Sequence, residues 1–147
     1  MNISQIFERS NFTALCVYAT LPSGFLESLS ESGGGEFTES RRWVGALEIL
    51  NRNRKRGLRL PILFARRERA DGIRYLGIVD QITIPTPEMA SHGTSLVRVS
   101  MIQHLLPKRP KGALRLKSTG LPLDPEFDRS YAICHTPDFL IGPGFLT

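Results

Sequence analysis

The sequence has little of what usually identifies a catalytic or metal centre. It contains two cysteines and three histidines in 147 residues, and neither Cys-x-x-Cys nor His-x-x-x-His occurs. A zinc site would have to be assembled from single ligands that lie far apart in the chain. We therefore expect no metal and no cofactor.

Long hydrophobic runs are also absent. No apolar stretch approaches the roughly 18 residues that a membrane span requires. The first nine residues (MNISQIFER) lack the basic-then-apolar order of an export signal, which predicts a cytoplasmic protein. Cys16 and Cys134 lie in apolar runs, which predicts buried, reduced thiols, with a disulfide as the alternative.

Glycine is concentrated in one stretch, residues 31–36 (ESGGGE), but a phosphate-binding motif is missing. Nucleotide-binding loops need GxxxxGK[ST] or GxGxxG, and this stretch has neither spacing. Three consecutive glycines are costly to order, so we expect a flexible linker here, or a mobile flap beside a site.

What the chain does have is segregated charge. Residues 1–40 carry a net charge of −4, residues 41–117 carry +12 and residues 118–147 carry −3. Arginine outnumbers lysine ten to one in residues 41–74. This pattern favours a polyanion as partner, and an Arg-rich solvated face without a ligand is the alternative.

The clearest structural signal is a β-hairpin. Residues 60–65 (LPILFA) form an apolar run, a charged stretch ending in Asp71-Gly72 follows, and a second β-branched run covers residues 73–84. Alternation predicts that Ile78 and Ile82 share one face of the second strand and that Val79 lies on the other.

Residues 41–50 (RRWVGALEIL) are typical of a helix, with Trp43, Ala46, Leu47 and Leu50 as its apolar stripe. Thr38 or Ser40 could cap this helix, and Gly57 could terminate it. Further strands are expected at residues 13–20, 96–102, 113–117 and 130–134, with a helical turn at 25–29 and a basic loop at 107–112. Five or six strands and one early helix predict a single α+β domain over residues 1–147. We expect a small mixed or antiparallel β-barrel with one or two helices packed at its rim.

Residues 38–102 resemble the PUA-like superfamily, the PUA, ASCH and EVE/YTH group of small β-barrels. In that group a helix precedes two strands, the first leading out of a basic stretch, as in residues 59–65 (RLPILFA), and the second with a central glycine, as in residues 75–80 (YLGIVD). The GxKxxExR pattern of ASCH domains and a set of cage aromatics are missing. The resemblance implies binding of RNA, or of DNA with modified or flipped bases.

We therefore expect a nucleic-acid-binding module, not an enzyme, with RNA and DNA both open and with no membrane partner. Phosphates would be held by arginines and a base would be approached by Arg74 or Tyr75, so the expected site is Arg41, Arg42, Arg54, Arg56, Arg59, Arg74 and Tyr75. One alternative is a metal-dependent nuclease that uses Glu68, Asp71 or Asp80. Another is a protein-interaction module with an acidic partner. The oligomeric state is left open.

Overall fold

The computed structural model describes residues 14–69, 71–84, 95–124, 127, 129–137 and 140. The residues in which an export signal was sought lie outside this part of the chain. Along the described part the elements are β1 (Leu15–Leu21), α2 (Ser23–Ser32), β2 (Gly34–Glu39), α3 (Val44–Lys55), β3 (Leu60–Arg66), β4 (Ile73–Thr83), β5 (Ser95–Arg109), the 3₁₀ turn η1 (Lys111–Ala113), β6 (Arg115–Leu116) and β7 (Tyr131–His135).

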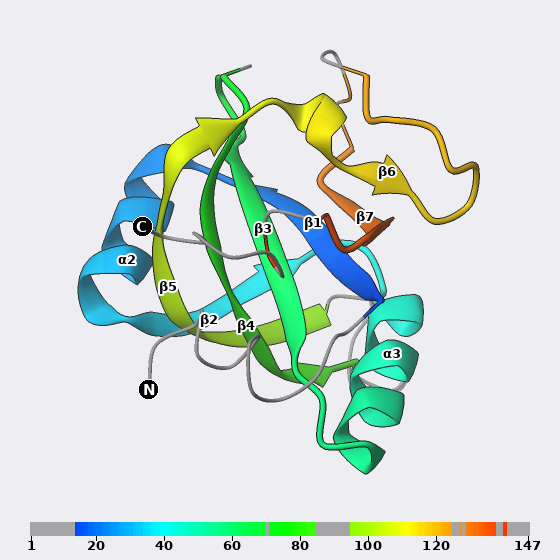
Figure 1. The fold of residues 1–147 in the computed structure, drawn as a ribbon. Helices are drawn as coiled ribbons and strands as arrows, with labels where there is room; N and C mark the ends of the chain where they lie inside the picture. Colours follow the sequence, from blue (N-terminus) through cyan, green and yellow to red (C-terminus); the bar gives the residue numbers. More distant parts are fainter. Residues whose placement is uncertain are drawn as a thin grey trace.

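The strands form one mixed sheet in the order β2-β5-β4-β3-β1-β7-β6 (Figure 1). Only β1 and β3 pair in parallel among the described neighbours. The predicted α+β class is therefore confirmed. Within the described residues the outermost strands β2 and β6 do not pair, so the sheet is not closed and the expected barrel is not confirmed.

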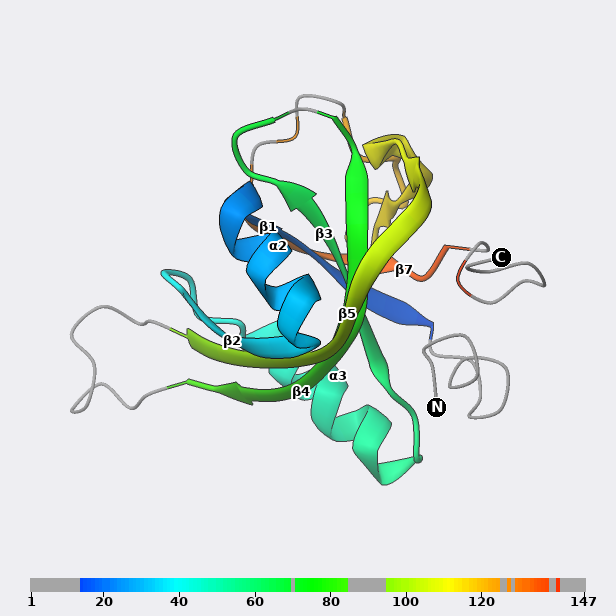
Figure 2. The ribbon, with the colours of Figure 1, turned by 90° about the vertical axis from the view of Figure 1, so that its left-hand side faces the viewer.

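Irregular pairing bends the longest strands. The register between β4 and β5 shifts at three places, and Met101, beside one shift, has a φ of 56° in the left-handed region. Such bulges bend the bulged strand and increase its twist. Figure 2 shows β4 and β5 turning together near their middles.

Because of the bulge between Val79 and Gln81, the predicted faces of β4 are wrong. Val79 and Ile82 pack in one core cluster with α3, whereas Ile78 packs in the other cluster with Leu76. The alternation argument failed here because it assumes an unbroken pleat, and one extra residue reverses every face beyond it.

The predicted hairpin of β3 and β4 is confirmed, and its central glycine has a clear role. A Cβ at Gly77 would overlap the end of the Ile102 side chain and would lie 3.0 Å from the Ser100 carbonyl oxygen. Glycine therefore lets β5 pack closely against β4 at this point.

Helix α3 begins at Val44, later than predicted, and ends at Lys55, close to the predicted terminator Gly57. Trp43, Ala46 and Leu50 are buried as expected, and Ile49 is buried beside them. Trp43 stacks on Tyr131, with ring centroids 4.4 Å apart, which confirms it as a core residue. Neither Thr38 nor Ser40 caps the helix. Instead, the Trp43 backbone N–H donates to Ser95 Oγ (2.9 Å) and the Ala46 N–H donates to the Tyr131 hydroxyl (3.1 Å).

Two predicted loops are wholly or partly regular structure. Gly34 and Gly35 begin β2, and a Cβ at Gly34 would lie 2.5 Å from the Val99 carbonyl oxygen, so this glycine permits a close approach of backbones. Residues 107–109 continue β5, and η1 follows them. Strand β2 and the end of β5 are ordered by pairing with segments that are distant in the sequence. Local sequence patterns do not reveal such pairing.

The two cysteines are buried and free, as predicted. They lie opposite each other on β1 and β7, and burial raises the pKa of both thiols, that of Cys134 to about 12. Within the described residues, no helix has the length and apolar character needed to cross a bilayer.

Candidate nucleic-acid interface

Seven exposed cationic side chains surround helix α3. They are Arg41, Arg42, Arg52, Arg54, Lys55, Arg56 and Arg59, and we call this set the α3 basic surface. Residues 41–59 contain only one acidic residue, Glu48, so the segment carries a net charge of +6. Figure 1 shows α3 at one end of the molecule, at the start of β3.

The packing of α3 explains why these cations are exposed. The helix buries Ala46, Ile49, Leu50 and Asn53 on one side, which leaves the opposite side of its last two turns to solvent. Cations in the last turn of a helix are also favoured by the helix dipole.

The chain beyond α3 folds back against the end of the helix. The Leu58 N–H donates to the Asn53 carbonyl (2.8 Å), and the Asn53 amide donates to the Arg59 carbonyl (3.3 Å). Gly57 permits this turn with a φ of 72°. Arg56 and Arg59 therefore lie close to the cations of the last helical turn.

Arg54 connects the basic surface to the sheet without losing its charge. Its guanidinium donates to the backbone carbonyl of Asp80 on β4. The contact involves the neutral backbone carbonyl of Asp80 and not its carboxylate. The hydrogen bond orients Arg54 and leaves its positive charge available to an anion.

Arg74 does not belong to this surface. It pairs with Asp71 (3.1 Å), which also accepts a hydrogen bond from Arg66. Arg74 and Asp80 are six residues apart on β4, or roughly 20 Å along an extended strand. Arg98, another cation outside the surface, pairs with Glu36 (2.7 Å). Within the described part of the chain, no member of the α3 basic surface is paired with a carboxylate.

Tyr75, the neighbour of Arg74 on β4, is not part of the α3 basic surface either. Its side chain lies in the core, with 4% of the residue exposed. The hydroxyl donates to Glu27 Oε2 (2.7 Å), and the ring lies against His104 with centroids 4.7 Å apart. Burial, followed by the Glu27 contact, raises the pKa of Tyr75 to about 12. Almost none of the ring is left for a nucleobase to stack on.

An apolar pocket that sequence reasoning missed lies between the end of β1, the start of α2 and the edge strand β2. It has a volume of about 360 Å³, and its lining is Leu21, Pro22, Phe25, Glu36, Phe37, Thr38, Arg67 and Leu96. Phe25 and Leu96 are partly exposed there, and Arg67 is held by a hydrogen bond from its guanidinium to the Thr20 carbonyl (3.0 Å). The lining comes from separate segments, so no local motif could have indicated it.

The carboxylates of the nuclease alternative do not gather. Glu68 accepts the Ser23 N–H (2.8 Å), a contact that lowers the pKa of Glu68, while Asp71 is engaged by two arginines. Asp80 lies further along β4. Among the described residues there is no group of three or more His, Cys, Asp or Glu that could hold a metal ion.

Comparison with known proteins adds no further constraint: no family model, no curated protein and no solved structure matches this chain.

Proposed function

We propose that this protein binds nucleic acid through the α3 basic surface. The observation that carries the proposal is the clustering of seven exposed cations around α3, none of which has a carboxylate partner among the described residues. Phosphates would supply the missing negative charge, and guanidinium groups suit them because they can bind phosphate oxygens in pairs.

The spread of the cations supports a polymer as the ligand. Helix α3 has 12 residues and is therefore about 18 Å long, with cations before its first turn, in its last turn and beyond its end. A single anion would contact one end of this surface. A chain of phosphates can contact both ends, and RNA and DNA both satisfy this requirement.

The apolar pocket beside β2 supports a second part of the proposal, a seat for one extruded base. Flipped bases are commonly held between apolar or aromatic side chains with a few polar groups at their edges, and Phe25, Leu96 and Arg67 offer these. Thr38 in the pocket is three residues from Arg41, a span of at most about 11 Å. A phosphate at Arg41 and a base in the pocket could therefore belong to neighbouring nucleotides.

The PUA-like relationship is part of the same proposal. Its support is the order of elements: a helix, a basic segment, and a strand pair whose second strand has a buried central glycine, Gly77. Binding of an extruded base would agree with what that resemblance implies.

The test is a gel-shift and salt titration with short single- and double-stranded RNA and DNA. We expect binding without magnesium, intact nucleic acid afterwards, and affinity that falls steeply with salt as counterions are released. The double variant Arg56→Glu/Arg59→Glu should lower affinity by at least about 100-fold, because two phosphate contacts become repulsions.

The matched control is Arg115→Glu/Lys117→Glu, which makes the same charge change at two exposed positions outside the α3 basic surface. It should have a much smaller effect. Equal losses for both double variants, or affinity independent of salt, would overturn the proposal. Magnesium-dependent degradation would point to the nuclease alternative. The variant Phe25→Ala removes an aromatic side chain from the apolar pocket and therefore tests the base seat separately.

A further inference from the structure

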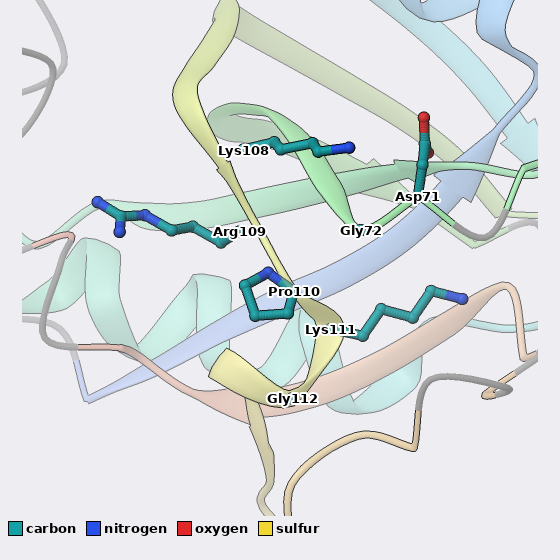
Figure 3. Close-up of a pocket in the computed structure, with 7 residues that line it drawn as sticks. All are labelled: Asp71, Gly72, Lys108, Arg109, Pro110, Lys111 and Gly112. Atoms are coloured by element: carbon teal, nitrogen blue, oxygen red, sulfur yellow. The ribbon is translucent and has the colours of Figure 1, made fainter.

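A second pocket lies at the far end of the sheet from the α3 basic surface. It has a volume of about 390 Å³ and is lined by Asp71 and Gly72, from the turn between β3 and β4, and by residues 108–112, where β5 passes into η1 (Figure 3). Pockets for small ligands commonly have volumes of about 300 to 1,000 Å³, so this one is large enough for a small molecule.

Positive charge predominates in this pocket. Among the described residues, Lys108, Arg109 and Lys111 line it together with one carboxylate, that of Asp71. Arg66 and Arg74 both donate to Asp71 Oδ2, so two cations outside the lining already balance that carboxylate. In Figure 3 the side chains of Lys108 and Lys111 extend toward the same side as Asp71, while Arg109 extends the other way.

The framework of the pocket is held by backbone contacts. Ile73 pairs with Arg109 across the β4–β5 ladder, and a Cβ at Gly72 would lie 2.5 Å from the Arg109 carbonyl oxygen. Lys111 is anchored by a hydrogen bond from its Nζ to the Phe127 carbonyl (3.0 Å), which leaves its charge in place. The Lys108 side chain is exposed and makes no hydrogen bond or ion pair with another described residue.

We propose that this pocket binds a phosphate group, held by Lys108 and Lys111. Two lysines on one side of a preformed pocket place two ammonium groups where a dianion can accept hydrogen bonds from both. The described residues of the lining include no aromatic side chain for a base to stack on, unlike those of the apolar pocket beside β2. The phosphate could belong to a small phosphorylated compound or to the phosphorylated end of a nucleic-acid strand. The site does not depend on the function proposed for the α3 basic surface.

The experiment is a titration of the full chain with inorganic phosphate and then with ribose 5-phosphate, followed by the amide NMR signals of Gly72 and Gly112. We expect saturable shifts of both signals. Lys108→Gln should weaken binding roughly tenfold, because one charge-assisted hydrogen bond is lost. Lys117→Gln, at an exposed lysine outside the pocket, should leave it unchanged.

A third arm compares one short oligonucleotide with a 5′-phosphate and with a 5′-hydroxyl. Preference for the phosphorylated end that disappears in Lys108→Gln identifies a strand end as the source, and the absence of this preference with intact phosphate binding identifies a small compound. The absence of saturable shifts, or equal weakening by Lys108→Gln and Lys117→Gln, overturns the proposal. Because inorganic phosphate is tested alone, failure here is distinguishable from failure of nucleic-acid binding at α3.

Discussion

A buried serine side chain that is distant in the sequence makes hydrogen bonds at the start of helix α3. Ser95 is fully buried at the start of β5, where its hydroxyl accepts the Trp43 N–H (2.9 Å) and donates to the Arg41 carbonyl (2.7 Å). The helix therefore has a cap that comes from a residue 52 positions away. Local cap residues were present in the sequence, but a tertiary hydrogen bond replaced them.

Ser95→Ala should lower the free energy of unfolding by about 1 to 3 kcal/mol, because the buried Trp43 N–H and the partly buried Arg41 carbonyl lose this partner. Urea denaturation measures the loss. Ser40→Ala, at the exposed position where a local cap was expected, should change stability little. Comparable losses for the two variants would mean that Ser95 does not act as the cap.

At the scale of the element, local patterns predicted what neighbours in sequence determine. The hairpin of β3 and β4, the strands β1 and β7 and the apolar side of α3 all follow from periodicity within one segment. Strand β2 was missed because its glycines resemble a linker, and their role appears only when Val99 of β5 is beside them.

The candidate site, like the fold, was only partly predictable from local sequence patterns. The exposure of Arg41, Arg42, Arg54, Arg56 and Arg59 follows from a helix with one apolar side. The separation of Arg74 had a local signal, since Asp71 precedes it by three residues. The apolar pocket beside β2 had none, because its lining residues come together only in the folded chain.

The close packing of β4 on β5 gives a prediction for Gly77. Gly77→Ala should destabilise the fold by about 1 to 3 kcal/mol, because the new methyl group overlaps the Ile102 side chain. Combining it with Ile102→Val, which removes the overlapping methyl group, should recover part of this loss. Thermal and urea unfolding of the four proteins gives the coupling energy.

Gly24 provides the control for that cycle. It lies in α2, and a Cβ there would meet no other atom within 4 Å. Gly24→Ala should leave stability unchanged or raise it by up to about 1 kcal/mol, as alanine is the better helix former. Additive effects of Gly77→Ala and Ile102→Val would show that the overlap is relieved elsewhere.

For the whole molecule, buried phenols and thiols predict a loss of stability in alkali. Burial raises the pKa of Tyr18 and of Tyr75 from 10.0 to about 12, and that of Cys134 from 9.0 to about 12. The folded state therefore keeps protons that the unfolded chain releases. The associated stability is present below about pH 9 and is lost as the pH rises toward 12.

Circular dichroism during a pH titration from 7 to 12 should show cooperative unfolding before these groups titrate in the folded state. Tyr18→Phe is the informative variant, because the Tyr18 hydroxyl is buried with no hydrogen-bond partner among the described residues. At pH 7 this variant should be as stable as the parent or slightly more stable, and above pH 10 it should be clearly more stable. An unchanged alkaline midpoint would contradict this account of Tyr18.

The place of β1 in the sheet has a consequence for synthesis on the ribosome. Of the described strands β1 is translated first, yet one of its two neighbours, β7, is translated last. Until β7 has left the exit tunnel, the side of β1 around Cys16 has no backbone partner there. A nascent chain stalled before residue 131 would thus carry an open strand edge, the kind of surface that chaperones shield from aggregation.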